Sequence, residues 1–379
     1  MNFRYRTALL MVSVSAAALL TSCTTGSAES SQPRSTPPLS GPSTPALPDS
    51  PPSPPGQAVA GSIPRTIASG LEAPWSVVRY NGATLVSERD TARILEIVDG
   101  GAARVLGTIE GVAGGGEGGL LGLAVDDEQR LYVYSTALDG NRIQRFRLSG
   151  SPGSLGLGQA ETIVEGIPSA SYHDGGRIAF GPDGMLYATA GDAGQRDNAQ
   201  DLASPGGKIL RMEADGAVPE DNPFPGSLVY SYGHRNPQGL TWDGNGTMFA
   251  TEFGQNTWDE LNIIRPGSNY GWPVVEGVAN SAGFTDPVQQ WEPSVASPSG
   301  MTHLNGTLFI ANLRGRVLRA VPVSDPGTST DYYSDEYGRI RDVLPGPEGD
   351  LWILTSNTDG RGRPTPEDDR LLSVSPVMR

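Results

Sequence analysis

The sequence predicts an all-β chain, more specifically a six-bladed β-propeller, and three observations support this prediction. The 379 residues include 50 glycines and 32 prolines, about twice the share of these turn formers in an average protein. Only 18% of the residues are charged and 37% are hydrophobic, which is too apolar for a wholly disordered chain. A short turn-and-strand phrase recurs along the chain, and no segment sustains the 3.6-residue apolar period of an amphipathic helix.

The recurring phrase joins a turn containing Gly or Asp to a β-rich run with a large apolar residue. Its six copies occupy residues 80–86, 127–134, 181–189, 243–251, 304–311 and 346–354. They follow one another at roughly 40 to 60 residues, the period of four-stranded propeller blades. Longer insertions fall between the third and fifth copies. The alternative is a pair of β-sandwiches whose turns are similar by coincidence.

The N-terminus predicts a bacterial lipoprotein signal over residues 1–22. Arg4 and Arg6 give it a basic start, and an apolar stretch over 8–20 is too short for a stable membrane span. Small residues then precede Cys23, the single cysteine of the chain, which excludes an intramolecular disulfide. We expect cleavage before Cys23 and a lipid on that residue. An ordinary secretory signal with an unrelated cysteine is the alternative.

Residues 23–61 predict an extended tether, because Ser, Thr and Pro dominate this stretch and cannot bury a core. Ten of the prolines lie between Pro33 and Pro55. Residues 62–379 then form one propeller domain. This organisation predicts an extracytoplasmic protein that a lipid anchors to the bacterial cell membrane.

The net charge of the chain limits the kinds of molecule that it is expected to bind. The formal net charge of −15 disfavours nucleic acid as a partner. Two of the few basic residues, Arg339 and Arg341, are spaced by two, so on a strand both side chains would point to one face. Two neighbouring guanidiniums repel each other unless an anion lies between them. The pair therefore indicates a bound polyanionic small molecule, or else an ordinary surface pair.

Three stretches between the repeats carry candidate chemistry. His173 lies in a glycine-containing loop before a predicted strand, where an imidazole suits a general base. The turn at 232–239 holds Arg235 and Asn236 between Gly and Pro, which suits an anionic or carbonyl-bearing ligand. Residues 251–262 and 267–273 combine acids and amides with glycine turns, as a hard-cation site for Ca²⁺ would require. Each stretch could also be merely structural.

Together, these stretches resemble the soluble quinoprotein glucose/sorbosone dehydrogenases, and in particular the aldose sugar dehydrogenase branch that uses pyrroloquinoline quinone (PQQ). The resemblance covers essentially the whole globular part. The motifs that carry it are Gly70-Leu-Glu-Ala-Pro-Trp75, Gly116-Glu-Gly-Gly-Leu-Leu-Gly122, His173-Asp-Gly-Gly-Arg177, Gly233-His-Arg-Asn-Pro-Gln-Gly239, Asp259-Glu-Leu-Asn262, Asn269-Tyr-Gly-Trp-Pro273, Trp291-Glu-Pro-Ser-Val-Ala296 and Arg339-Ile-Arg-Asp342. The family is a six-bladed propeller, in agreement with the repeat count.

The resemblance implies an enzyme that oxidises the C1 hydroxyl of an aldose to a lactone and transfers the hydride to PQQ. His173 would be the catalytic base and Arg235 would stabilise the negative charge that develops on the quinone oxygen. Asn236 would contact the cofactor. The residues that would face its carboxylates are Arg314, Arg339 and Arg341.

The resemblance also implies calcium. The carbonyls of Gly254 and Gln255 would hold the Ca²⁺ beside the quinone. Glu260 and Tyr270 match positions that bind a further, structural Ca²⁺. The number of calcium ions is left open.

The chain departs from the glucose-specialised members of that family. Tyr172 stands where they have an acid, Glu117 where they have an amide, Arg314 where they have a lysine and Gln255 where they have a proline. Glu117 and Tyr172 are the expected substrate contacts, and glucose as sole substrate is not implied.

Two other functions remain as alternatives. A metal-dependent lactonase on a similar propeller would need a carboxylate-rich metal centre, and a propeller could also be a binding module without catalysis. The physiological aldose, the electron acceptor and the oligomeric state do not follow from the sequence.

Overall fold

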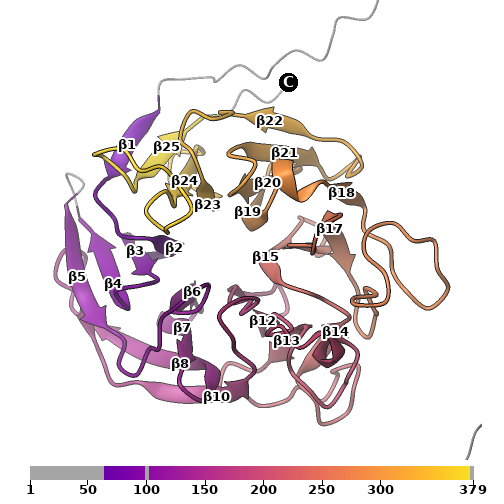
Figure 1. The fold of residues 1–379 in the computed structure, drawn as a ribbon. Coiled ribbons are helices and arrows are strands. Elements are labelled where there is room, and N and C mark those ends of the chain that lie inside the picture. Colours follow the sequence, from indigo (N-terminus) through magenta and orange to yellow (C-terminus); the bar gives the residue numbers. More distant parts are fainter. Residues whose placement is uncertain (1–63, 99–101, 376–379) are drawn as a thin grey trace, which may run out of the picture. The chain divides into compact units, whose positions relative to one another are not determined.

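The computed structural model describes residues 64–98 and 102–375, and these residues form a six-bladed β-propeller. Six antiparallel sheets are arranged in a ring about a central axis, each with its first strand innermost (Figure 1). The predicted signal, Cys23 and the predicted tether lie outside the described residues. Among the described residues, no helix is long and apolar enough to cross a membrane.

The first three blades contain the strands that follow. Blade 1 consists of β2 (Pro74–Tyr80), β3 (Ala83–Glu88), β4 (Arg93–Ile97) and β5 (Ala103–Thr108). Blade 2 consists of β6 (Leu120–Val125), β7 (Arg130–Ala137), β8 (Gly140–Ser149) and β10 (Glu161–Ile167), with the short β9 (Gly156–Leu157) paired to β8. Blade 3 consists of β11 (Ile178–Phe180), β12 (Leu186–Ala190), β13 (Lys208–Met212) and β14 (Val229–Tyr232), with a 3₁₀ turn η1 (Arg196–Ala199) after β12.

The last three blades complete the ring. Blade 4 consists of β15 (Pro237–Trp242), β16 (Met248–Glu252), β17 (Asp259–Ile264) and β18 (Gln289–Trp291), followed by the 3₁₀ turn η2 (Pro293–Val295). Blade 5 consists of β19 (Pro298–Leu304), β20 (Thr307–Asn312), β21 (Leu318–Pro322) and β22 (Thr330–Tyr332). Blade 6 consists of β23 (Ile340–Pro345), β24 (Leu351–Thr355), β25 (Leu371–Val374) and β1 (Arg65–Ala68).

The six-bladed prediction is confirmed, and the repeated phrase has a simple structural meaning. Each copy covers the tight turn between the first and second strands of a blade and the second strand itself, as with the turn between β2 and β3. The expected insertions lie mainly in blades 3 and 4, and the longest one joins β17 to β18 (Figure 1).

The ring is closed by the strand nearest the N-terminus. β1 pairs antiparallel with β25 and becomes the outer strand of blade 6, so both ends of the domain share one sheet. The hydrophobic core lies between neighbouring blades: Tyr132 and Tyr134 of blade 2 pack with Leu186 and Leu210 of blade 3 in one fully buried cluster.

Candidate active site in the channel

Bulges in the inner strands direct side chains into the channel. In β2, β15 and β23, one extra residue interrupts the pairing with the second strand, and these residues are Trp75, Gln238 and Arg341. A bulge turns its extra side chain out of the alternating pattern of the strand. All three side chains line a cavity of about 370 Å³. The inner strands thus build the site at the points where they depart from regular geometry.

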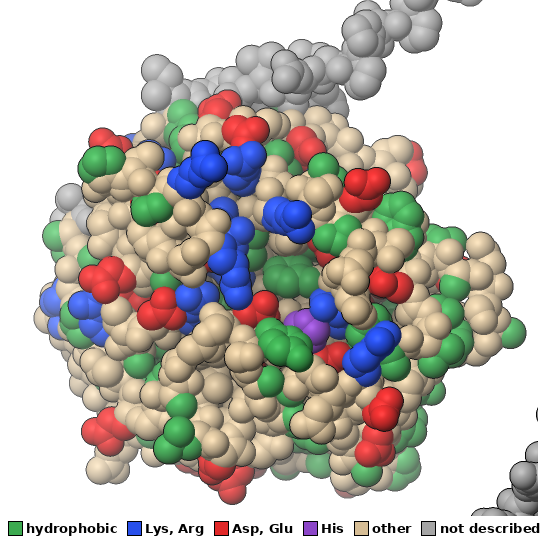
Figure 2. All heavy atoms as spheres, viewed as in Figure 1, with side chains coloured by type: hydrophobic (Ala, Val, Ile, Leu, Met, Phe, Trp, Pro, Cys, Tyr) green, Lys and Arg blue, Asp and Glu red, His purple; other side chains and the backbone are tan. Residues whose placement is uncertain are grey.

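The cavity is rich in arginine. Arg314, Arg339, Arg341, Arg89 and Arg361 line it, together with the carboxylate of Glu117. Figure 2 shows the molecule from this face, hollowed at the centre of the ring and bordered by Lys and Arg side chains. In a chain with a net charge of −15, this concentration of cations marks a place suited to an anionic ligand.

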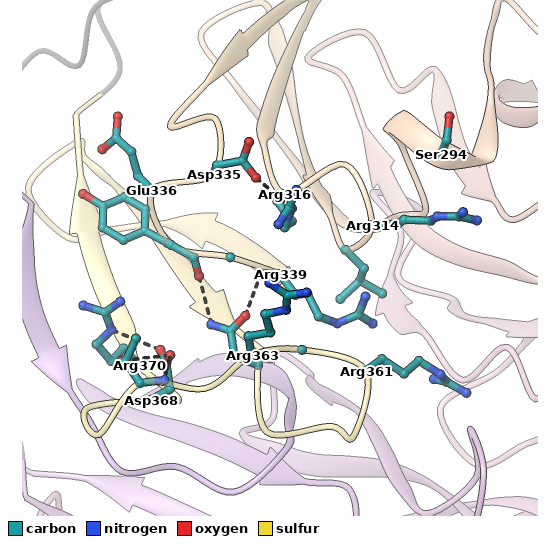
Figure 3. A pocket seen from close by; sticks show the side chains of 16 residues that line it. Ser294, Arg314, Arg316, Asp335, Glu336, Arg339, Arg361, Arg363, Asp368 and Arg370 are labelled. Carbon is teal, nitrogen blue, oxygen red and sulfur yellow. Dashed lines mark hydrogen bonds and ion pairs between the residues drawn. The ribbon is translucent and has the colours of Figure 1, made fainter.

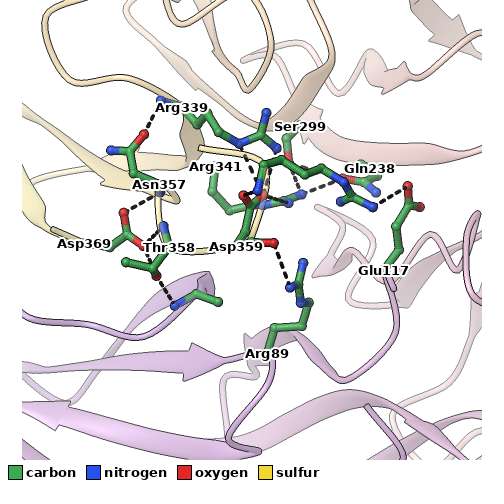
Figure 4. Close-up of polar contacts among 12 residues, drawn as sticks. Arg89, Glu117, Gln238, Ser299, Arg339, Arg341, Asn357, Thr358, Asp359 and Asp369 are labelled. Atoms are coloured by element: carbon green, nitrogen blue, oxygen red, sulfur yellow. Dashed lines mark hydrogen bonds and ion pairs between the residues drawn. The ribbon is translucent and has the colours of Figure 1, made fainter. Parts of the chain in front are cut away.

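Arg339 and Arg341 converge, but not through strand periodicity as the sequence suggested. Arg339 precedes β23 and Arg341 occupies its bulge, so the two do not alternate on a regular strand. The anion between them is a side chain: Oδ2 of Asp359 lies 2.8 Å from Nη2 of Arg339 and 3.9 Å from Nη2 of Arg341 (Figure 4). The protein therefore supplies part of the charge that was expected from a ligand.

Arg341 remains incompletely satisfied. Its Nη1 donates to Oε1 of Gln238 at 2.9 Å and to Oγ of Ser299 at 3.3 Å, while its buried Nε has no partner among the described residues. Burial lowers the pKa of Arg341 to about 9; Asp359 opposes the shift, and Arg339 adds to it. An anionic group in the cavity would relieve both the orphaned donor and the repulsion.

His173 is held by a carboxylate that the sequence analysis missed. Nδ1 of His173 lies 2.7 Å from Oδ1 of Asp192, and Oδ2 of Asp192 accepts a hydrogen bond from Nε1 of Trp272 at 2.8 Å. Burial raises the pKa of Asp192, but its hydrogen bond and charge interaction with His173, with help from Trp272 and Gly194, bring the pKa below its usual value. An ionised Asp192 cannot donate, so the hydrogen of this bond sits on Nδ1, and it is the neutral form of the imidazole that would have its lone pair on Nε2.

The backbone of His173 is also fixed. Its φ is +64°, a left-handed conformation that is costly for most non-glycine residues. Its N–H donates to Oε2 of Glu117 at 2.9 Å. Tyr172, 47% exposed, packs edge-on against the imidazole at 4.7 Å between ring centroids. Both predicted substrate contacts, Glu117 and Tyr172, therefore lie beside the predicted base.

Asn236 lies behind this group rather than in the cavity. It is fully buried. Its Nδ2 donates to Oε2 of Glu117 at 3.1 Å, and its Oδ1 accepts from the N–H of Gly175 at 3.1 Å. With both amide atoms engaged, Asn236 positions Glu117 and the loop that carries His173.

Arg235 is directed toward the predicted calcium carbonyl. Its Nη1 donates to the carbonyl of Gly254 at 2.6 Å and to that of Phe253 at 3.1 Å. Burial lowers the pKa of Arg235, and its buried Nε has no partner among the described residues. The side chain of Glu276 accepts the N–H of Gln255 at 2.7 Å. The oxygen of Gly254 would thus be shared between Arg235 and a calcium ion.

Glu260 and Tyr270, the second predicted calcium pair, are buried in a region that also contains the carboxylate of Glu252. Glu260 accepts from the N–H of Gly277 at 2.7 Å and from Nδ2 of Asn262 at 3.1 Å. Burial, followed by the charge of Glu252, raises the pKa of Glu260 to about 8. The hydroxyl of Tyr270 is already used, since it donates to the carbonyl of Ile263 at 2.7 Å. Among the described residues, no group of three or more His, Cys, Asp or Glu side chains is arranged to hold a metal ion.

The other two histidines lie outside this arrangement. His234 is fully buried between Ser231 and Glu252. His303, on β19, accepts the N–H of Gly306 at 3.1 Å. Of the three histidines, only His173 both pairs with a carboxylate and lies beside the cavity in the channel.

The fold and the site define a propeller whose channel combines a histidine held by a carboxylate with a cavity lined by arginines. Comparison with known proteins identifies the class. The family model described as Glucose / Sorbosone dehydrogenase matches residues 71–365, and the chain belongs to this family.

Similar proteins agree with this assignment. The aldose sugar dehydrogenase YliI of Escherichia coli is 33% identical over 301 residues, covering 69% of this chain and 78% of that protein. The PQQ-bound aldose sugar dehydrogenase of Streptomyces coelicolor is 46% identical with a TM-score of 0.80, over 85% of this chain and 99% of that one. A glucose dehydrogenase-like oxidoreductase of Thermus thermophilus is 39% identical with a TM-score of 0.75, over 82% and 99% of the two chains.

Proposed function

We propose that this protein oxidises the C1 hydroxyl of aldoses to the lactone, with PQQ as the hydride acceptor. The observation that carries the proposal is the His173–Asp192 pair, held beside a cavity whose cations exceed its carboxylates. The PQQ-bound relative from Streptomyces coelicolor supports the choice of cofactor. In the same cavity, Nε of Arg341 is a buried hydrogen-bond donor without an acceptor among the described residues.

In this proposal, each residue around the cavity has a separate role in catalysis or binding. Nε2 of His173 takes the proton of the sugar hydroxyl, and Asp192 stabilises the imidazolium that results. Glu117 and Tyr172 border the position of the sugar. PQQ, when bound, would supply an electrophilic carbonyl as the acceptor of the C1 hydride. Arg314, Arg339 and Arg341 would hold its carboxylates, and Arg235 would stabilise the negative charge that develops.

Calcium belongs to the same proposal. The atoms that would coordinate calcium are oxygens, as Ca²⁺ requires. They are the carbonyls of Gly254 and Gln255 for the ion beside the quinone, and oxygens of Glu260 and Tyr270 for the structural ion. Because the Tyr270 hydroxyl is engaged, Tyr270 would contribute its backbone carbonyl. The Gly254 carbonyl already accepts a hydrogen bond from Arg235, and its second lone pair would coordinate the ion.

The N-terminal part completes the proposal. Signal cleavage before Cys23 and a lipid on that residue would hold the enzyme at the bacterial membrane, outside the cytoplasm. The tether of residues 23–61 would separate the catalytic domain from the lipid surface. Growth of the cells with a radioactive fatty acid tests this part separately. The protein should become labelled, and the variant Cys23→Ser should not.

Reconstitution tests the catalytic part. The purified protein is given PQQ and Ca²⁺, several aldoses are offered in turn, and bleaching of an electron-accepting dye is followed. We expect turnover only with PQQ present. PQQ-independent turnover, or no turnover with any aldose, contradicts the proposal, and lactone hydrolysis without redox activity would favour the lactonase alternative instead.

A further inference from the structure

A second basic cavity adjoins the cofactor cavity. It measures about 650 Å³ and lies between the turn after β20 and the loops before β23 and after β24 (Figure 3). The two cavities share Leu313, Arg314, Arg339 and Arg361 as a common wall. The arginines that line the second cavity are Arg314, Arg316, Arg339, Arg361, Arg363 and Arg370.

Most arginines of this cavity have a carboxylate partner. Asp335 pairs with Arg316 at 2.8 Å, Asp368 with Arg370 at 3.3 Å and Asp359 with Arg339 at 2.8 Å. Glu117 lies 3.9 Å from Arg361, and Glu336 also lines the cavity. Arg314 and Arg363, in contrast, make no hydrogen bond or ion pair with the described part of the chain. The cavity therefore offers two unpaired guanidiniums to an anion.

The wall that carries Arg314 and Arg316 is rigid. The N–H of Gly315 donates to the carbonyl of Ala296 at 2.8 Å, and a Cβ on Gly315 would lie only 2.3 Å from the carbonyl oxygen of Val295. Arg316 is held at a φ of +54°, a conformation that costs free energy in a non-glycine residue. The turn thus fixes the backbone from which Arg314 and Arg316 extend, which lowers part of the entropic cost of binding.

The opposite wall turns its carboxylates inward and its guanidiniums outward. In the loop after β24, Oδ1 of Asp359 accepts the N–H of Arg361 at 2.9 Å. Asp369 accepts the N–H of Thr358 at 3.0 Å (Figure 4). Asp369 is used to hold this loop, whereas Oδ2 of Asp359 also screens Arg339 at 2.8 Å. In Figure 3, Arg314 and Arg361 extend from the two walls toward the same side of the cavity.

We propose that this second cavity binds a small polyanion, and that the polyanion is the electron acceptor that reoxidises the cofactor. This inference rests on the proposed function. Oxidation of one aldose to its lactone yields two electrons and two protons. A one-electron polyanionic acceptor would collect the electrons in two successive encounters, and both protons would leave to solvent.

Position distinguishes an acceptor from an acidic sugar. His173, Glu117 and Tyr172 are not among the residues that line this cavity, and its shared wall approaches the substrate side where Arg361 lies 3.9 Å from Glu117. A volume of about 650 Å³ is that of a small-molecule site. Fixed guanidiniums recognise polyanions through charge-assisted, often bidentate hydrogen bonds.

Direct binding provides a test without turnover. The probe is hexacyanocobaltate(III), a redox-inert trianion, titrated calorimetrically into the full chain saturated with PQQ and Ca²⁺. The variants are Arg363→Glu and Arg316→Gln. The matched control is Arg147→Glu, an exposed arginine on β8 that changes the net charge as Arg363→Glu does. We expect affinity about tenfold weaker in Arg363→Glu, weaker also in Arg316→Gln, and unchanged in the control.

Kinetics then assign the anion its role. With hexacyanoferrate(III) as acceptor, the acceptor KM should rise about tenfold in Arg363→Glu, while the KM for the aldose and the turnover with the cation hexaammineruthenium(III) stay unchanged. Equal trianion binding by all variants would overturn the site. A rise in the KM of a uronic acid instead of the acceptor would overturn the acceptor role. Absence of turnover with any acceptor, beside intact trianion binding, would mean that the proposed function has failed and the acceptor role with it.

Discussion

The imidazole of His173 and the carboxylate of Asp192 lie 2.7 Å apart, although 19 positions separate them in the sequence. His173 lies in the loop that enters blade 3 through β11, and Asp192 follows β12 of the same blade. Because β11 and β12 pair antiparallel, the start of one strand and the end of the other meet at the same end of the blade. Ordinary hairpin geometry thus produces a base and its orienting partner.

Replacing Asp192 with Asn should abolish most activity without loss of fold. The amide can donate to Nδ1 and so favour the tautomer in which Nε2 carries the hydrogen, which cannot accept a proton from the sugar. In a serine protease triad the same change costs about 10⁴ in kcat, so we expect a loss of about 10² to 10⁴. Steady-state kinetics and PQQ binding by fluorescence quenching check this.

The variant His173→Asn gives the lowest turnover with which Asp192→Asn can be compared. Asn tolerates the left-handed backbone that His173 adopts and cannot act as the base. Turnover should fall at least as far as in Asp192→Asn, with PQQ affinity nearly intact. Activity of Asp192→Asn near the wild-type value would remove Asp192 from its positioning role.

Calcium should stabilise the protein in a pH-dependent manner. Burial raises the pKa of Glu260 to about 8, so at neutral pH a proton must leave before this carboxylate can act as an anionic ligand. Saturation at 100 times the Kd contributes about 2.7 kcal/mol, which corresponds to a rise in Tm of about 5 °C. The shift should be larger at pH 8.5 than at pH 6, and smaller in Glu260→Gln. Scanning calorimetry with and without chelator measures it, with Mg²⁺ as the control ion; a shift independent of both pH and Glu260 would contradict the assignment.

Asp342 should be among the most destabilising positions to truncate. Its Oδ2 accepts from Nη1 of Arg177 at 2.8 Å and from the N–H of Val77 at 3.1 Å, so one carboxylate links blades 6, 3 and 1. Asp342→Ala leaves a buried guanidinium without its partner, which costs about 3 to 5 kcal/mol. Urea unfolding measures this loss. The exposed pair of Glu161 and Arg145 is the control, since Glu161→Ala should cost less than about 1 kcal/mol. Equal losses in the two variants would mean that Asp342 has no linking role.

The repeat made the blades predictable, but the site depends on local departures from the repeat. Six similar turns were enough to predict six sheets, since each turn joins two adjacent strands. The bulges at Trp75, Gln238 and Arg341 are set by tertiary packing, and nothing in local sequence marks one extra residue in a strand. Asp359 was missed although hairpin geometry explains its position: it follows β24, which pairs antiparallel with β23, and so meets Arg339 at the start of β23.

The resemblance assigned roles to residues, and the structure shows the present contacts of those residues. Arg314 and Arg341 line the cavity; that they face the carboxylates of a cofactor stays a prediction. Asn236 instead supports Glu117, and Arg235 rests on the carbonyl of Gly254. Which face of a loop residue meets the channel depends on neighbouring blades, and no spacing along the chain encodes that.

Asp174 gives a prediction about stability against pH. The residue is 1% exposed, and its Oδ2 has no partner among the described residues. Burial raises its pKa to about 6, although hydrogen bonds from Asn141 and Ala170 oppose the shift. The native state therefore binds more protons than the unfolded chain between about pH 4 and 6, and stability falls as pH rises through this window. The full effect is on the order of 3 kcal/mol.

Asp174→Asn removes this titration. The free energy of unfolding of the variant minus that of the wild type should become more positive by about 2 to 3 kcal/mol between pH 4 and 7, whatever its absolute value at one pH. Urea unfolding at a series of pH values measures the difference, which cancels the titration of His173 and Glu117. Asp139→Asn, at an exposed turn between β7 and β8, should give a flat difference. Parallel curves for Asp174→Asn and the wild type would contradict the prediction, because only a carboxyl with the same pKa in the native and unfolded states leaves no trace in the difference.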